Sequence, residues 1–160
     1  MRGLTSSRKG AAAEAEIAAA LIRLNHLVLK PLIEGGRYDL AVDLGDRWLR
    51  LQCKWASRRG AVLSARCATS RHTPRGYRRR TYSSREIDGI AAYAPATDTC
   101  YLVPIHEIEG RSMISLRLAP TRNMQAAGIR WAADCELARS LKRNWSGDRS
   151  SAASMQRAIT

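Results

Sequence analysis

Residues 37–54, with the sequence RYDLAVDLGDRWLRLQCK, constrain the fold more than any other stretch of the chain. Two apolar segments flank the Gly-Asp pair at residues 45–46, which predicts a β-hairpin with a short turn. In its second strand, Gln52 and Lys54 share one parity and therefore one face of the sheet. Pairing around the turn places Asp39 opposite the end that carries them. The hairpin therefore predicts that a carboxylate, an amide and an amine meet.

The rest of the chain has the pattern of a mixed α/β or α+β domain. A length of 160 residues favours one domain, which we place at residues 1–143. An Arg/Ser/Thr-rich stretch at about residues 66–85 is typical of a long exposed loop. Residues 144–160, rich in Ser, Ala and Arg, have the composition of a disordered tail. Spacing and composition predict a helix at 8–25, strands at 26–33, 61–66, 87–95, 99–105 and 113–120, a helical turn at 105–109 and a helix within 123–144, with 61–66 joining the sheet of the hairpin.

The positive charge of the chain is concentrated in one segment. The formal net charge is +13, and residues 47–85 contain 12 Arg and Lys residues but no Asp or Glu. The remainder carries 15 basic and 14 acidic residues, which nearly balance. A block of one sign suits a polyanion, and nucleic acid is the first expectation. A solvated basic face that binds nothing specific is the alternative. A membrane surface is disfavoured, because the block lacks an amphipathic helix pattern.

Cysteine usage and hydropathy exclude several classes of protein. The cysteines form no C-x-x-C pair and no paired Cys/His spacing, which argues against a zinc site and a disulfide framework. Reduced thiols in a cytoplasmic protein are expected. No apolar run reaches the length of a membrane span, and charged residues interrupt the Ala-rich start, which favours a helix over a signal peptide. The four cysteines are Cys53, Cys67, Cys100 and Cys135.

The polar residues of the hairpin are suited to hydrolysis of a phosphodiester. Asp39 offers a hard oxygen ligand for Mg²⁺, Gln52 a neutral amide oxygen, and the backbone carbonyl of Cys53 a third oxygen. Lys54 can orient or deprotonate a water molecule, or stabilise charge on a phosphate. In the N-terminal helix, Glu14 falls on the stripe that faces the sheet, whereas the neighbouring Glu at 16 points toward solvent.

Each of these residues also has a simpler explanation. Asp39 could pair with Arg37 or Arg50 near the turn. Lys54 could be the first residue of the basic block, and Gln52 a polar residue on an exposed strand face. Asp88, at the start of a later strand, is expected to be structural and to pair with an arginine of the basic block.

The ordered set of segments resembles a known nuclease superfamily. KGAAAE, RYDLAVD, LRLQCK, EIDGIAAYAPATDTCYLVPI and GIRWAADCEL follow one another in the sequence. A helix Glu, a strand Asp and then (Glu or Gln)-x-Lys on the next strand is the layout of PD-(D/E)XK nucleases. The chain is most similar to the group I intron-associated, homing-endonuclease-like branch. Tyr38 replaces the Pro of the superfamily name, a position without a chemical role.

The resemblance implies a restriction-endonuclease-like core, with a central mixed β-sheet flanked by helices. It implies a metal-dependent DNA endonuclease with Mg²⁺, or Mn²⁺ in its place, acting as a homo-oligomer (dimer or tetramer) on double-stranded DNA. A Holliday-junction resolvase and a non-catalytic DNA-binding protein with a degenerate nuclease fold remain alternatives. The implied catalytic residues are Glu14, Asp39, Gln52 and Lys54, and the implied metal ligands are Asp39, Gln52 and Cys53.

DNA contacts are expected in the basic block and mostly to phosphates, which position the protein without reading sequence. Tyr77 and Tyr82 are expected to stack on DNA or to hydrogen-bond its backbone. The expected DNA-binding residues are Arg58, Arg59, Arg71, His72, Arg75, Arg78, Arg79 and Arg80.

Overall fold

The computed structural model describes residues 3–33, 35–121 and 127–146, and leaves the side chains of residues 70–73 and 77 undescribed. Most of the predicted tail, residues 147–160, therefore lies outside the described residues. The last described helix, α3 (Leu137–Trp145), extends two residues past the predicted domain end at residue 143. The tail prediction was wrong for residues 144–145, because they complete the final turn of that helix.

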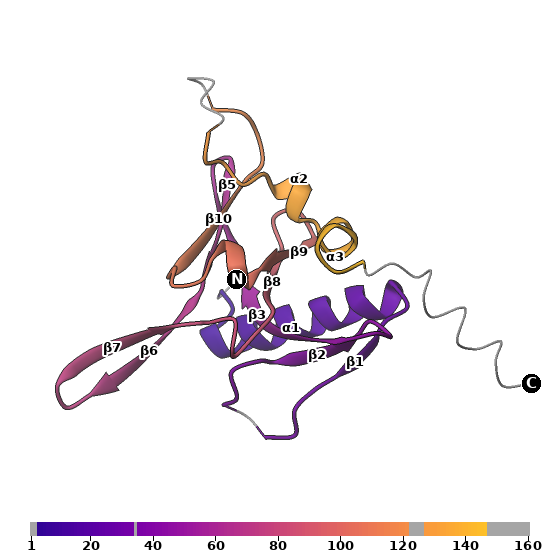
Figure 1. Ribbon diagram of the computed structural model, residues 1–160. Coiled ribbons are helices and arrows are strands. Elements are labelled where there is room, and N and C mark those ends of the chain that lie inside the picture. The colour runs from indigo at the N-terminus through magenta and orange to yellow at the C-terminus, as the bar shows by residue number, and fades with distance from the viewer. Residues whose placement is uncertain (1–2, 34, 122–126, 147–160) are drawn as a thin grey trace, which may run out of the picture.

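Five strands form a central mixed sheet in the order β1-β2-β3-β8-β9. β3 and β8 run parallel, and the other neighbouring pairs run antiparallel. The mixed sheet predicted from the sequence is confirmed, and Figure 1 shows it as the centre of the molecule. The strands are β1 (Leu27–Leu29), β2 (Leu40–Asp43), β3 (Trp48–Trp55), β8 (Gly89–Ala94) and β9 (Thr99–Pro104).

The predicted hairpin is β2–β3, and its turn is the predicted Gly-Asp pair. The N–H of Leu44 donates to the carbonyl of Arg47 at 2.9 Å across this turn. Gly45 has a φ of 94°, a conformation that glycine adopts easily because it has no Cβ. Leu40 pairs with Leu51 in the register. The preceding residue is Asp39, which therefore lies next to the end of β3.

One face of the central sheet is covered by α1 (Ser6–Arg23), as Figure 1 shows. Its buried residues recur every four positions and form a single stripe on the helix. Burial of a large aliphatic side chain in such a stripe stabilises the fold by about 1.5–3 kcal/mol. None of the described helices combines the length and the hydrophobicity needed to cross a bilayer. This core contains Ala13, Ile17 and Leu21 of α1, Leu49, Leu51 and Cys53 of β3, and Leu137 and Leu141 of α3.

The opposite face packs against a smaller sheet of three strands in the order β10-β5-β4. Because Leu51 and Cys53 face α1, strand alternation directs Gln52 and Lys54 toward this second face. The prediction that residues 61–66 join the sheet of the hairpin was wrong. They form β5 in the smaller sheet. The strand that lies beside β3 is β8, and the two pair in parallel, which the sequence spacing does not specify. The small sheet comprises β10 (Met113–Arg117), β5 (Val62–Arg66) and β4 (Ser57–Arg59), and the remaining short helices are η1 (Ile105–Glu107) and α2 (Ala132–Cys135).

The predicted basic loop is instead a two-stranded hairpin, β6 (Ala68–Thr73) and β7 (Gly76–Thr81). We call residues 68–81 the basic arm. It pairs with no other described strand and projects away from the body of the molecule (Figure 1). The loop prediction was wrong because the two strands carry Arg, Ser and Thr and lack the apolar alternation that marks a half-buried strand.

Candidate active site

Asp39 lies where the chain enters β2, and the strand pairing fixes its position. Its backbone N–H donates to the carbonyl of Leu51 at 2.9 Å, which keeps it in the ladder with β3. Its carboxylate accepts the backbone N–H of Cys53 at 2.7 Å and a second hydrogen bond from the side-chain amide of Gln52. The structure therefore brings together three residues that the sequence singled out.

Cys53 offers the site its backbone and not its thiol. The N–H and C=O of one strand residue point to the same side of the strand. Because the N–H of Cys53 points to Asp39, its carbonyl oxygen faces the same gap between β2 and β3. The side chain is buried in the core under α1, where desolvation raises the pKa of the thiol well above its usual range. The thiol stays protonated, so the carbonyl is the group available to a cation.

Glu14 approaches the site from α1. Its side chain is half-buried and accepts a hydrogen bond from Nζ of Lys30 at 2.7 Å. Its negative charge contributes to the raised pKa of Asp39. Glu16 is exposed, as the helical spacing predicts. The helix therefore directs one of its two glutamates toward the site.

Lys54 lies two residues beyond Gln52 on the same strand face. Its charge lowers the pKa of Asp39, in opposition to the effect of Glu14. Its Nζ lies 5.6 Å from the centroid of the Tyr82 ring, which is buried with 3% of its surface exposed. Lys54 thus interacts with both the carboxylate of Asp39 and a buried aromatic side chain.

Burial is the main reason that the pKa of Asp39 is raised above its usual range. The N–H of Cys53 opposes this rise, Glu14 adds to it, and the cations of Lys54 and Lys30 oppose it. The folded protein therefore holds a proton on Asp39 more tightly than an exposed aspartate would. A buried carboxylate next to a like charge is stabilised by a bound cation, so the electrostatics of the site favour a metal ion.

The donor atoms of the site fit a hard divalent cation. Carboxylate, amide and carbonyl oxygens are the ligands that Mg²⁺ prefers. Within the described residues, no group of three or more His, Cys, Asp or Glu side chains could hold a metal ion by itself. A cation held here would therefore also take neutral oxygens, from Gln52 and Cys53, beside the carboxylate of Asp39. Gln52 now turns its Nε2 to Asp39, and a half-turn of the amide would bring Oε1 to the same side.

The simpler explanation for Asp39, an ion pair with a nearby arginine, was wrong. Nε of Arg50 lies 3.0 Å from a carboxylate oxygen of Asp88, which also accepts the backbone N–H of Arg50 at 2.7 Å. Arg37 pairs with Glu86. Both candidate partners are thus engaged elsewhere, and the predicted structural role of Asp88, pairing with an arginine of the basic block, is confirmed.

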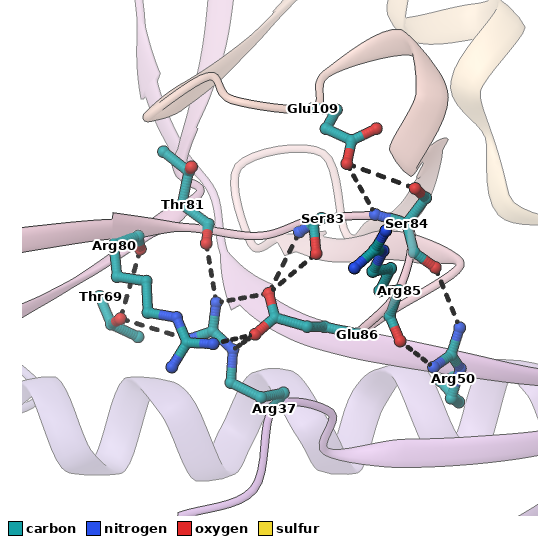
Figure 2. A network of polar contacts seen from close by, with 10 residues as sticks. All are labelled: Arg37, Arg50, Thr69, Arg80, Thr81, Ser83, Ser84, Arg85, Glu86 and Glu109. Atoms are coloured by element: carbon teal, nitrogen blue, oxygen red, sulfur yellow. Dashed lines mark hydrogen bonds and ion pairs between the residues drawn. The ribbon is translucent and has the colours of Figure 1, made fainter.

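Figure 2 shows a polar network centred on Glu86. Glu86 accepts a hydrogen bond from Nη2 of Arg37 at 3.1 Å, and Nε of Arg37 lies 2.9 Å from its other oxygen, an ion pair in which the N–H is not aimed at the oxygen. Arg80 also pairs with Glu86. The hydrogen bond from Arg37 is the main cause of the lowered pKa of Glu86. The network joins the base of the basic arm to the segment that leads into Asp39.

The predicted DNA-binding residues divide into three groups. The arginines of β4 and three arginines of the arm are exposed and form no ion pair with a described carboxylate. Arg80 is exposed but pairs with Glu86. The side chains of Arg71, His72 and Tyr77 lie outside the described part of the chain. The exposed, unpaired group comprises Arg58, Arg59, Arg75, Arg78 and Arg79.

Sequence reasoning missed two residues that surround the site, Lys30 and Glu86, and assigned the wrong role to a third, Tyr82. Lys30 bonds to Glu14, which lies 16 positions earlier in the chain. A single lysine after a short apolar strand has no sequence pattern that indicates such a contact. Glu86 ends the acid-free block and is the first carboxylate after it, a signal that could have suggested an internal counter-ion. Tyr82 was predicted to contact DNA, and this was wrong, because its ring is buried in the core with Ile87 and Ile90.

Two comparisons with known proteins give matches, one to a family model and one to a solved structure. A family model described as PD-(D/E)XK endonuclease matches residues 4–138. Among solved structures, a bacterial homing endonuclease, I-Ssp6803I, superimposes with a TM-score of 0.72 and 23% sequence identity, over 86% of this chain and 93% of that chain. A search of curated proteins gives no match. At this identity the structural likeness concerns the fold, and it confirms the predicted restriction-endonuclease-like core.

Proposed function

The chain belongs to the PD-(D/E)XK endonuclease family, and on this premise we propose that it is a metal-dependent DNA endonuclease that hydrolyses phosphodiester bonds in the manner of a homing endonuclease. The observation that carries the proposal is the contact of Asp39 with Gln52 and Cys53, beside Lys54 on the same strand. This contact brings Asp39, Gln52 and Cys53 together at one end of the central hairpin, which supports their proposed role in the motif.

PD-(D/E)XK nucleases typically use divalent metal ions, and the oxygen donors here suit Mg²⁺, with Mn²⁺ as a substitute. Asp39, the amide oxygen of Gln52 and the carbonyl of Cys53 would hold the ion. Such an ion activates a water molecule and polarises a phosphate. Lys54 supplies a fixed positive charge where negative charge develops on the scissile phosphate. Glu14 adds a second carboxylate, which can orient the attacking water.

Because Gln52 is neutral, the site carries one negative charge fewer than a site with Glu at this position. Metal affinity falls with the number of charged ligands, so one tightly held ion is expected. Asp39 is consequently the main electrostatic attraction for that ion. The helix carboxylate of Glu14 reinforces it, because its charge already acts on Asp39.

We propose that the substrate is double-stranded DNA and that the basic arm and β4 hold it. Arginine donates several N–H groups in a planar fork that suits phosphate oxygens. A two-stranded β-ribbon of this kind also has the width to enter the major groove. The exposed arginines Arg75, Arg78 and Arg79 on the arm, with Arg58 and Arg59 on β4, are the proposed contacts.

We further propose that the working form is a homo-oligomer, a dimer or a tetramer. A domain of this size spans few base pairs, and a long target requires several subunits. The large apolar side chains of Leu27, Leu29 and Trp48 are 42–63% exposed near the β1 edge, and Leu27 and Trp48 both pair with Asp43 of the strand between them. Sedimentation with a duplex target measures the mass, and a single protein chain per complex at saturating protein would refute this assembly.

The function is tested by incubating the protein with linear duplex, supercoiled plasmid and a four-way junction. We expect cleavage in the presence of Mg²⁺ or Mn²⁺ and none after chelation with EDTA, because the donor oxygens then lack a cation. Strong preference for the junction would instead favour a resolvase. Tight, salt-dependent binding without cleavage under any divalent ion would identify a non-catalytic DNA-binding protein and overturn the proposal.

A further inference from the structure

We propose that Tyr82 is a positioning residue for Lys54, and that the ion pair between Arg37 and Glu86 holds Tyr82 in place. The inference rests on the proposed nuclease function, because it concerns the lysine of the motif. Tyr82 itself lies outside the motif and 28 positions along the chain from Lys54. It would act through Lys54 and would not touch the substrate.

The contact between Lys54 and Tyr82 has the geometry of a cation–π interaction. Nζ of Lys54 lies 5.6 Å from the ring centroid, within the range over which an ammonium is attracted to an aromatic face. The ring is buried with 3% of its surface exposed, so water does not compete for the contact from the core side. A lysine side chain has many rotamers, and a fixed attractive surface restricts them. Tyr82 therefore limits where the ammonium of Lys54 can be.

Tyr82 is itself held by Arg37. The guanidinium carbon of Arg37 lies 4.2 Å from the same ring centroid. Nη2 of Arg37 donates to the carbonyl of Thr81 at 2.8 Å, one residue before Tyr82. Glu86 then fixes Arg37 through the hydrogen bond and the ion pair drawn in Figure 2. Arg37 therefore holds both the ring of Tyr82 and the backbone of the residue before it.

The position of Tyr82 in the chain gives this contact a second consequence. Tyr82 directly follows Thr81, the last residue of the basic arm. Arg80 of the arm joins the same network through Glu86. DNA held by the arm and the ammonium of Lys54 are therefore positioned relative to the same buried ring. The arrangement suits a step in which the scissile phosphate must arrive at a fixed lysine.

Two substitutions separate positioning from simple core packing. Tyr82→Phe keeps the aromatic face, and Tyr82→Leu removes it while keeping an apolar side chain. Tyr101→Leu is the matched control, because Tyr101 is equally buried at 3%, belongs to the same core cluster and lies on β9, two strands away from β3. Both leucine variants lose a tyrosine from one core, but only one loses the neighbour of Lys54.

The kinetic measurement is single-turnover cleavage of duplex DNA by the full-length protein with Mg²⁺, at a temperature where each variant is folded. We expect Tyr82→Leu to lower the cleavage rate at saturating DNA about 10- to 100-fold, the range that follows from misplacing a reacting group by about 1 Å. DNA affinity should change little, because Tyr82 is buried and is not one of the proposed DNA contacts. Tyr82→Phe and Tyr101→Leu should cleave at close to the wild-type rate.

A spectroscopic measurement tests the same contact without relying on cleavage. The chain has four lysines, so labelling lysine with ¹³C at Cε gives four resolvable signals, and Lys54→Arg identifies the signal of Lys54. The ring current of Tyr82 should displace that signal in the wild type and in Tyr82→Phe. In Tyr82→Leu the signal should move to the position of a solvated lysine, whereas Tyr101→Leu should leave it unchanged.

The outcomes distinguish the two proposals. A wild-type protein that never cleaves DNA, with the Lys54 signal displaced by Tyr82, would overturn the proposed function and retain the contact. A Tyr82→Leu protein that cleaves like the wild type would overturn the positioning role. The role would equally be overturned by a Lys54 signal that is the same in Tyr82→Leu and wild type, or by Tyr101→Leu slowing cleavage as strongly.

Discussion

Replacement of Asp39 by Asn is expected to abolish metal-dependent cleavage while raising the melting temperature of the metal-free protein. Asn removes the charge that attracts the cation but keeps an oxygen that can accept the N–H of Cys53. Loss even of outer residues around a metal typically costs about 10- to 100-fold in affinity or activity, so loss of this ligand should cost at least about 100-fold in cleavage rate. Cleavage of duplex DNA over a range of Mg²⁺ concentrations measures the effect.

The gain in stability follows from the pKa of Asp39. A raised pKa in the folded state means that the charged carboxylate is less favourable in the folded chain than in the unfolded chain. The wild type therefore loses stability as the pH rises from the usual aspartate value of 3.8 through the higher folded value. Asn carries no charge at any pH. The melting temperature of the variant should exceed that of the wild type at neutral pH, and the difference should shrink in acid.

Asp43→Asn is the matched control for this substitution. Asp43 is the last residue of β2, the strand that Asp39 precedes, and its carboxylate accepts the backbone N–H of Gly45 at 2.7 Å, a local contact within the turn. We expect the control to cleave DNA at the wild-type rate. Wild-type cleavage by Asp39→Asn would remove Asp39 from the catalytic site. A melting temperature below that of the wild type at neutral pH would contradict the direction of the pKa shift.

Removal of three arginines from the basic arm should produce the largest change in DNA binding. The variant Arg75→Ala/Arg78→Ala/Arg79→Ala leaves the Arg80–Glu86 ion pair in place. Each lost phosphate contact lowers the dependence of log K on log salt by about 0.9, so the slope should fall by up to about 2.7 and the affinity at ~0.1 M salt by roughly 100-fold or more. Fluorescence anisotropy with a labelled duplex, titrated at several salt concentrations, gives both quantities.

The control for the arm variant removes the same charge elsewhere. Arg8, Arg23 and Arg111 are exposed and lie on α1 or before β10, so their combined replacement by Ala also lowers the formal net charge from +13 to +10. We expect the control to retain most of the affinity and the salt slope. Equal losses in the two triple variants would show that overall charge attracts DNA and that the arm has no special role. The arm variant should leave the central sheet folded because the arm pairs with no other described strand, and the control should do so because its three arginines are exposed.

The parts of the fold that were predictable depend on local patterns. The β2–β3 hairpin was predicted because a Gly-Asp pair and strand alternation are encoded within 18 consecutive residues. The burial of one face of α1 was predictable for the same reason, because its helical spacing repeats every turn. By contrast, the arm was predicted as a loop, because its two strands pair with each other without an apolar face. The third strand of the hairpin's sheet was misassigned, because the parallel pairing of β3 with β8 joins distant segments.

In the candidate site, too, local contacts were predictable from the sequence and long-range contacts were not. The sequence alone determined that Asp39 meets the end of β3, because a hairpin of known turn has one register and strand alternation sets the parity of Gln52 and Lys54. Only the tertiary structure decided which groups surround that cluster. Lys30 bonds to Glu14, Glu86 pairs with Arg37, and the ring of Tyr82 lies beside Lys54. These contacts join segments 16 to 49 positions apart in the chain. Such contacts depend on how the sheet, helix and arm pack together, and no local periodicity of the sequence encodes that packing.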